Sequence, residues 1–204
     1  MSEIRVLIVE DDPIIAEDIK EMLTNVDYTV LGIAYSKMEA IRLIDLYAPD
    51  LALLDINLNG SYEGFDIATH INNTRKIPFL YLTSYSGKEF VNQAKITSPM
   101  GYIIKPFNEA ELYSSIEVAL YNFSRFLLPA SLNKDQINSI LFTPLTDREF
   151  EILTGLYEGV TNQQLANRNF VSVNTVKTHL KNIYEKLETH TRSETISKLT
   201  EMLH

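Results

Sequence analysis

Cysteine is absent from the 204 residues, so the chain has no disulfides and no thiolate for catalysis or metal binding. No apolar run approaches the roughly 18 residues that span a bilayer. The start, Met1-Ser2-Glu3-Ile4, lacks the basic and then apolar layout of a signal peptide. These absences predict a cytoplasmic protein with no membrane partner. Apolar residues still make up 45% of the chain, which is enough for one large core or two small ones.

Charge is distributed unevenly along the chain. Residues 1–120 hold nine Lys and Arg against eighteen Asp and Glu, whereas residues 121–204 hold nine against nine. An acidic half joined to a neutral half predicts two domains with different partners. We expect a first domain at residues 1–121, a linker at 122–143 and a second domain at 144–204. The linker is rich in Phe and Leu, so part of it is expected to extend the preceding helix or to pack on a domain, with a disordered tether as the alternative.

Short apolar runs separated by helical patterns predict the fold of the first domain. Strands are expected at Ile4–Val9, Tyr28–Ala34, 51–54, 77–82 and Gly101–Ile104. Helices are expected from Pro13, at Lys37–Tyr47, at 67–71, at about 88–96, and from the cap Asn108 to about residue 122. Five strands alternating with five helices predict an α/β fold with a doubly wound, five-stranded parallel sheet.

Polar side chains follow the ends of four of these strands. Glu10, Asp11 and Asp12 follow the first strand, Asp55 the third, Thr83 the fourth and Lys105 the fifth. In a parallel sheet these ends share one edge, where open α/β sheets bind ligands. Asp55 is expected just beyond its strand, because a buried acid needs a partner.

The chemistry of this group indicates a cation and a phosphoryl group. Crowded carboxylates repel one another unless a cation joins them. Oxygen ligands with no His or Cys nearby favour Mg²⁺. A lysine and a hydroxyl can neutralise and bind the oxygens of a transferred phosphoryl group, and an aspartate carboxylate can accept that group.

Four segments carry a family resemblance: Val9-Glu10-Asp11-Asp12-Pro13, Leu54-Asp55-Ile56-Asn57, Leu82-Thr83-Ser84 and Ile104-Lys105-Pro106-Phe107. With them, residues 1 to about 121 resemble the receiver domain of two-component response regulators, which has a flavodoxin-like (βα)5 fold. One departure is the loop at residues 59–64, which is one residue longer than usual and lacks the Pro of the Pro-Gly turn that usually follows the phosphoacceptor.

The resemblance implies roles for individual residues. Asp55 would be the phosphoacceptor, in an acidic pocket with Glu10 and Asp11. Mg²⁺ would be held by Asp11, Asp55 and the backbone carbonyl of Asn57. Thr83 and Lys105 would contact the phosphoryl oxygens, Tyr102 would be the switch aromatic, and the Lys105-Pro106 bond would be cis.

Helix signals also organise the second domain. Thr146 and Glu149 form a capping-box pattern, and Thr161 and Ser172 are further caps. Helices are expected after Thr146 and at Asn162–Arg168, Val173–Leu187 and Arg192–Leu203. Val176, Leu180, Ile183 and Leu187 make a buried stripe on the third of these helices. A short helix, a tight turn and a longer helix with a polar, basic outer face indicate a helix-turn-helix. From charge pattern alone, that outer face could also be an ordinary solvated surface.

The sequence of residues 144–203 resembles the LuxR-type (NarL/FixJ-like) four-helix DNA-binding domain. The segments that match are Leu145-Thr146-Asp147-Arg148-Glu149, Gly159-Val160-Thr161-Asn162, Leu165-Ala166, Val171-Ser172 and Thr175-Val176-Lys177-Thr178-His179. The resemblance implies that Lys177, Thr178 and Lys181 face bases and phosphates in the major groove, with Asn174 and Thr175 near the backbone. Asn169 replaces a typically buried Leu, which we expect to soften the turn. Glu188 replaces the Gly that ends the recognition helix, which removes an easy left-handed cap.

Together these features predict a phosphorylation-gated transcription regulator. A sensor histidine kinase would phosphorylate Asp55, and the phosphorylated chain would form a homodimer on an inverted-repeat DNA site. Two alternatives belong to other classes. A Mg²⁺-dependent phosphatase would need a general acid where Asn57 stands, and a second domain without net charge could bind a protein instead of DNA.

Overall fold

The computed structural model describes residues 4–26, 28–84, 94–127 and 132–203. These residues divide into two compact units. We call Arg5–Ala119 the N-terminal unit and Leu120–His204 the C-terminal unit. The domain and linker limits expected from the sequence, at residues 121 and 144, stay predictions.

A five-stranded parallel sheet forms the centre of the N-terminal unit, with the strand order β2-β1-β3-β4-β5. The strands are β1 (Ile4–Val9), β2 (Tyr28–Ala34), β3 (Leu51–Asp55), β4 (Phe79–Thr83) and β5 (Gly101–Ile104). In the register of the central strands, Leu53 of β3 lies between Ile8 of β1 and Leu80 of β4. Every residue of β3 and β4 is buried, which explains their continuous apolar runs: a parallel sheet is covered on both faces.

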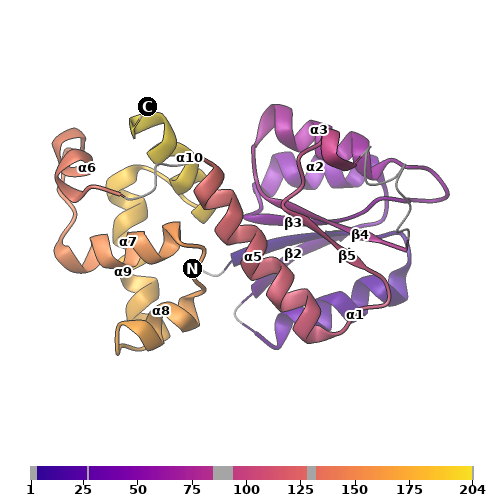
Figure 1. The fold of residues 1–204 in the computed structure, drawn as a ribbon, viewed down its shortest axis with the longest axis horizontal. Helices are drawn as coiled ribbons and strands as arrows, with labels where there is room; N and C mark the ends of the chain where they lie inside the picture. The colour runs from indigo at the N-terminus through magenta and orange to yellow at the C-terminus, as the bar shows by residue number, and fades with distance from the viewer. Residues whose placement is uncertain (1–3, 27, 85–93, 128–131, 204) are drawn as a thin grey trace. The chain divides into compact units, whose positions relative to one another are not determined.

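Helices cover both faces of this sheet (Figure 1). Figure 1 shows α2 (Lys37–Tyr47) and α3 (Gly64–Thr74) together on one face, and α1 (Pro13–Thr24) and α5 (Glu109–Leu127) on the other. Asp12 caps α1 by accepting a hydrogen bond from the backbone N–H of Ile14 at 2.8 Å. The helix expected at about 88–96 lies largely outside the described residues.

Three boundaries in the N-terminal unit differ from the sequence-based expectation, which the extension of α5 to Leu127 instead confirms, since part of the 122–143 segment was expected to continue that helix. Helix α3 is eleven residues long rather than five: its last turn is polar, and its first turn offers only Phe65 as an apolar residue. Strand β4 begins at Phe79, after Pro78. Asp55 is the last residue of β3, not the first residue beyond it, because its backbone still pairs with Leu82 of β4.

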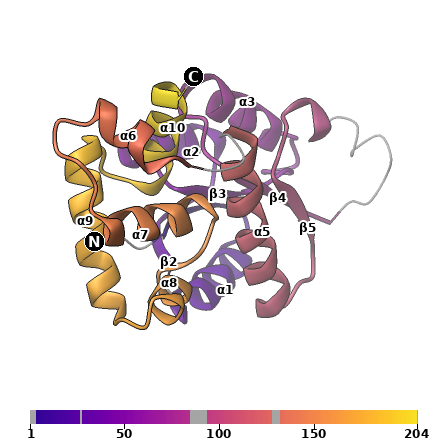
Figure 2. The ribbon, with the colours of Figure 1, turned by 60° about the vertical axis from the view of Figure 1, so that its left-hand side comes forward.

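Beyond α5, the described residues of the C-terminal unit form five helices: α6 (Lys134–Ile140), α7 (Asp147–Tyr157), α8 (Asn162–Arg168), α9 (Val173–Leu187) and α10 (Arg192–Leu203). Helices α8, α9 and α10 have the bounds expected from the sequence, and α7 begins directly after Thr146 as expected. Thr146 and Glu149 form a capping box at α7, and Thr161 and Gln164 form a second one at α8. Figure 2 shows α9 beside α7 and α8, and α9 contacts both.

The core of this unit is built around α9. Val176, Leu180, Ile183 and Leu187 are buried, which confirms the predicted stripe. Helices α7 and α8 approach closely at Gly155, where a Cβ atom would lie 2.2 Å from the side chain of Leu165. Within the described residues, none of the helices is both long enough and apolar enough to cross a membrane.

Helix α6 was missed by the sequence analysis, which treated residues 122–143 as a linker. Asn133 caps this helix by accepting a hydrogen bond from Gln136 N–H at 3.1 Å, and Ile137 is fully buried. The cap was a usable signal, but seven residues provide too little periodicity to indicate a helix.

Candidate functional site

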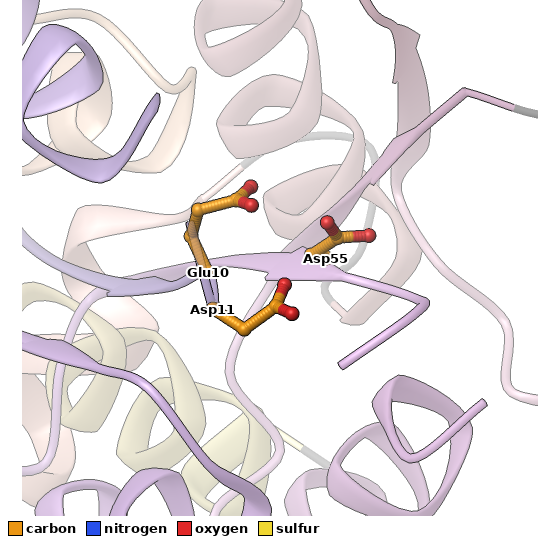
Figure 3. Close-up of side chains that lie close together, drawn as sticks. All are labelled: Glu10, Asp11 and Asp55. Carbon is orange, nitrogen blue, oxygen red and sulfur yellow. The ribbon is translucent and has the colours of Figure 1, made fainter. Parts of the chain in front are cut away.

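Three carboxylates meet at the carboxyl edge of the sheet (Figure 3). Glu10 and Asp11 directly follow β1, and Asp55 ends β3. One carboxylate oxygen from each lies within 4.8 Å of the others. Glu10 is 1% exposed and Asp55 8% exposed, so two of these charges are largely removed from water. Adjacent parallel strands bring the three acids together as expected.

Lys105 joins this cluster from the end of β5. Its Nζ atom donates a hydrogen bond to Oδ2 of Asp55 at 2.6 Å and another to Oε2 of Glu10. The other oxygen of Asp55, Oδ1, accepts the backbone N–H of Asn57 at 3.0 Å. Lys105 thus contacts two of the three acids, and among the described residues this one ammonium is paired with a group of three carboxyls, which leaves an excess of negative charge at the site.

Burial and charge shift the pKa values here in identifiable ways. Burial is the largest influence on Glu10 and raises the pKa of its carboxyl to about 7; the charge of Asp55 acts in the same direction, and Lys105 opposes both. Burial alone would lower the pKa of Lys105, but its hydrogen bonds and charge interactions with Asp55 and Glu10 outweigh that effect and raise the pKa. Lys105 is therefore held in its charged form.

Two further predicted residues lie on the neighbouring strands. Thr83 ends β4 and is 2% exposed, and its backbone carbonyl accepts the N–H of Lys105 at 2.8 Å. Tyr102 on β5 pairs with Tyr81 of β4 and has 57% of its surface exposed. The peptide bond between Lys105 and Pro106 is cis, which confirms that expectation.

The oxygen-rich donor set fits a magnesium ion. Carboxylate oxygens from Glu10, Asp11 and Asp55 are close enough to share one cation. The side-chain Oδ1 of Asn57, two residues after Asp55, is buried and accepts no hydrogen bond from the described part of the chain. Neither Cys nor His is part of the group, which disfavours zinc and other softer metals.

All five predicted DNA-contacting residues lie on α9, in the first three turns after its cap, Ser172. Asn174, Thr178 and Lys181 are exposed, whereas Thr175 and Lys177 are half-buried. Lys181 forms a weak, exposed contact of 3.8 Å with Glu185. The structure thus places three of the five residues fully on the outer face and two at its border.

Asn169, which was expected to soften the helix-turn-helix turn, is held there by several hydrogen bonds. Its side-chain amide donates to the carbonyl of Leu165 at 2.7 Å. Arg148 of α7 donates to the Asn169 side-chain oxygen at 3.0 Å and to the Asn169 carbonyl at 2.5 Å. A polar clamp from another helix replaces the buried leucine. Sequence reasoning missed it because residues 148 and 169 are 21 positions apart.

Comparisons with known proteins match both parts of the chain. Residues 6–117 match the family model "Response regulator receiver domain", and residues 143–199 match "Bacterial regulatory proteins, luxR family". The response regulator protein VraR of Staphylococcus aureus is 31% identical over 198 residues, which is 95% of this chain and 94% of that protein. The chain belongs to the response regulators, with a receiver domain and a LuxR-type regulatory domain. Both matched domains are those of a regulator.

Other relatives match the receiver domain alone. The transcriptional regulatory protein PdtaR of Mycobacterium tuberculosis is 36% identical over 119 residues, which is 58% of this response regulator and 58% of PdtaR. Among solved structures, the signal receiver domain of a modulated diguanylate cyclase from Desulfovibrio desulfuricans G20 is 34% identical with a TM-score of 0.54. It covers 58% of this chain and 94% of that domain. The match to PdtaR covers little more than half the length of that protein.

Two features of this response regulator were not predicted from the sequence. Asn59 donates its backbone N–H to Oδ2 of Asp11 at 2.9 Å, which links the 59–64 loop to the acidic cluster. Glu188 keeps the left-handed backbone conformation (φ 52°) that a glycine would adopt more easily. The Asn59-Gly60 dipeptide was a possible signal for the first, but its contact with Asp11 depends on the tertiary fold.

Proposed function

We propose that a sensor histidine kinase phosphorylates this chain on Asp55 and that phosphorylation controls the binding of its LuxR-type domain to DNA. The observation that carries the proposal is the meeting of Asp55, Glu10, Asp11 and Lys105 at one sheet edge. The P–N bond of a phosphohistidine would break as an O–P bond forms to the Asp55 carboxylate, and the imidazole nitrogen would keep the electron pair and take up a proton.

Lys105 and Thr83 would act on the transferred group. Lys105 already contacts the Asp55 carboxylate, so its ammonium is placed to contact a phosphoryl group bound to that oxygen. Thr83 lies on the strand next to Asp55, since Asp55 pairs with Leu82, and would offer its hydroxyl. Hydrogen bonds to equatorial oxygens stabilise the charge that phosphoryl transfer spreads over them.

Asp11, Asp55 and the backbone carbonyl of Asn57 would hold Mg²⁺, with Glu10 completing the acidic pocket. The bound ion would neutralise the excess negative charge and allow a phosphate to enter among the acids. The residues of the chain would orient the acceptor: Asn57 N–H holds Oδ1 of Asp55, which keeps the carboxylate in one orientation.

The donor would approach beside α1. A hollow of about 300 Å³ lies there, lined by Ile15, Asp18, Ile19, Met22, Ser84, Lys105, Pro106 and Phe107. Ile14, at the start of α1, is 74% exposed. Because Lys105 belongs both to the hollow and to the acidic cluster, a histidine-bearing helix of a kinase seated there would bring its phosphohistidine to Asp55.

Phosphorylation would change the equilibrium between two receiver conformations. The added charge of about −1.5 to −2 would recruit Thr83 and Lys105. Tyr102, which is more than half exposed in this structure, would turn inward as Thr83 moves toward the phosphate. The altered face around β5 and α5 would release the second domain or promote a homodimer.

The LuxR-type domain would place α9 in the major groove of DNA. Lys177, Thr178 and Lys181 would contact bases and phosphates, and Asn174 and Thr175 would lie near the backbone. A domain with no net charge binds DNA modestly as a monomer. A homodimer that presents two such helices to an inverted repeat would bind much more tightly.

Labelling followed by a gel shift tests the proposal. Treat the native chain and Asp55→Asn with acetyl phosphate and Mg²⁺, map the modification by mass spectrometry, and measure the binding of DNA selected from a random pool. We expect label at Asp55, no label when EDTA is present, and tighter DNA binding after labelling. Label that persists in Asp55→Asn, or selected DNA that is bound no more tightly after labelling, would overturn it.

A further inference from the structure

The loop after β3 contains a tight turn that the receiver resemblance does not include. Leu58 and Ser61 exchange two backbone hydrogen bonds, of 2.9 and 3.0 Å, around Asn59 and Gly60. Both central residues have positive φ angles, 52° for Asn59 and 82° for Gly60. This is the backbone pattern of a two-residue type I′ turn, for which Asn-Gly is the preferred sequence. The turn is therefore a locally stable structure.

Both ends of the turn are fixed to the receiver core. Leu58 is fully buried in the hydrophobic cluster beneath the site. On the other side, the N–H of Gly64 donates to the carbonyl of Ile56 at 3.2 Å, and a Cβ atom on Gly64 would lie 2.4 Å from the carbonyl oxygen of Asp55. The loop thus lies directly against the backbone of the phosphoacceptor, and its path leaves little freedom to the turn between these anchors.

The anchored turn directs one backbone donor at the acidic cluster. The N–H of Asn59 donates to Oδ2 of Asp11 at 2.9 Å, across 48 residues of sequence. The Asn59 side-chain amide makes a longer contact of 3.4 Å with the carbonyl of Tyr35. A hydrogen bond to an ionised carboxylate is stronger than one between neutral groups. The bond from Asn59 restricts the rotation of the Asp11 side chain, and Oδ1 of Asp11 takes no part in it.

We propose that Asn59 is a positioning residue for the metal site, whose N–H holds the Asp11 carboxylate in the orientation that binds Mg²⁺. The inference rests on the proposed function, in which Asp11 is a metal ligand. Outer hydrogen bonds to ligating side chains commonly change metal affinity 10- to 100-fold. Proline has no N–H, so the Pro-Gly turn common among receivers could not form this bond if its proline stood at position 59. The departure at this loop therefore has a chemical consequence for the site.

Two substitutions at one position test the N–H and the turn that presents it. Asn59→Pro removes the donor and, because proline fixes φ near −65°, also the positive φ angle of the turn, whereas Asn59→Gly keeps both. Titrate Mg²⁺ into each full-length protein by isothermal calorimetry at constant ionic strength. We expect Asn59→Pro to bind Mg²⁺ about tenfold more weakly or worse, as for other lost outer partners of metal ligands. Asn59→Gly should stay within about twofold of the native chain, because glycine adopts this conformation without strain.

The labelling rate distinguishes positioning from general damage to the fold. With acetyl phosphate as donor, Asn59→Pro should need more Mg²⁺ for half-maximal labelling of Asp55 but should approach the native rate at saturating Mg²⁺. Native Mg²⁺ affinity in a folded Asn59→Pro protein would overturn the inference. So would equal losses of affinity in the Pro and Gly variants, because the side chain would then be responsible.

A measurement on the native chain covers the case in which Asn59→Pro does not fold. The Asn59 amide proton should exchange with solvent at least tenfold more slowly than its intrinsic rate in the metal-free protein, and Asp11→Ala should remove that protection. Unprotected exchange in the native chain would overturn the inference. If the native chain binds no Mg²⁺ at all, the proposed function fails instead, which is a different result.

Discussion

The Nζ atom of Lys105 lies 2.6 Å from Oδ2 of Asp55, across 50 residues of sequence and across the intervening strand β4. The same ammonium contacts Glu10, whose side chain is 1% exposed, while that of Asp55 is 12% exposed. A single cation thus stabilises two acids that are largely removed from water. When one partner of such a buried group is removed, the remaining charges lose their compensation.

Lys105→Ala should therefore destabilise the metal-free protein, by on the order of 3 kcal/mol. Mg²⁺ should raise the unfolding temperature of this variant more than that of the native chain, because a bound cation restores part of the lost compensation. Thermal unfolding with and without MgCl₂ measures both effects. Lys95→Ala is the control, since Lys95 is exposed and belongs to the same unit. Equal stabilities of the two variants would contradict the role of the buried ammonium.

Thr83→Ala should still accept phosphate on Asp55 but should respond weakly to it. The acceptor and the acids remain, whereas the hydroxyl that would bind the phosphoryl oxygen is lost. A charge-assisted hydrogen bond contributes about 1.5–3 kcal/mol, which corresponds to a roughly ten- to hundredfold change in a population ratio. Light scattering and gel shifts on the labelled protein should show mostly monomer and poor DNA binding. Thr83→Ser keeps a hydroxyl and should recover the response; native dimerisation of Thr83→Ala would show that the coupling uses another contact.

The double variant Lys177→Ala, Lys181→Ala should weaken DNA binding and leave Asp55 labelling unchanged, because the two sites lie in separate units. Each lost phosphate contact should reduce the slope of log affinity against log salt by about one, whereas a lost base contact should cost about 1–3 kcal/mol at one sequence position. Gel shifts over a range of salt concentrations separate the two cases. Lys198→Ala on α10 is the control, and native affinity of the double variant would mean that another face meets the DNA.

The Glu149–Lys186 pair should make the C-terminal unit sensitive to acid. Their side chains are 6% and 17% exposed and lie 2.6 Å apart, joining the first turn of α7 to the last turn of α9. Burial opposes the charge of Glu149, but its hydrogen bonds with Lys186 and Thr146 outweigh this and lower its pKa from 4.5. Because the pKa of Glu149 is lower in the folded than in the unfolded state, its ionised form stabilises the folded protein at pH values above the unfolded-state pKa. This stabilisation is lost as the pH falls through the folded-state pKa.

Glu149→Gln should therefore reduce stability at pH 7 by about 1.5–3 kcal/mol, the usual contribution of a hydrogen bond to a charged group. The difference from the native chain should shrink as pH falls below 4.5. Chemical unfolding at a series of pH values, followed by circular dichroism, measures this. Glu151→Gln is the matched control on α7, because the Glu151 side chain is 55% exposed. A difference that does not depend on pH would rule out the ionised pair as its source.

Phe170→Asn should stabilise the protein by about 1 kcal/mol. A left-handed backbone conformation costs most non-glycine residues at least about 1 kcal/mol, and it costs asparagine less. Phe170 has a φ angle of 54° and is 96% exposed, so the substitution removes little packing. Thermal unfolding checks the prediction. Phe142→Asn is the control, since Phe142 is equally exposed without a positive φ angle and should show no gain.

Local signals in the sequence were sufficient for most helices and strands. The caps at Thr161 and Ser172 fixed the starts of α8 and α9, because a side-chain oxygen there satisfies backbone N–H groups within three residues. Strands β1, β2 and β5 have the bounds that their apolar runs predict. Helix α6 was not predicted, because its cap at Asn133 is followed by only two helical turns.

The sequence by itself determined which residues could form the acidic site, because the alternation of strands and helices sends the ends of parallel strands to one edge. It determined neither the contacts nor the orientations there. Asn59 reaches Asp11 across 48 residues, and Arg148 clamps Asn169 across 21. Such bonds depend on how separate elements pack, and a donor's partner is set by the three-dimensional path of the chain. Only the tertiary structure therefore showed that a backbone N–H holds the second acid of the site and that a polar clamp replaces a buried leucine.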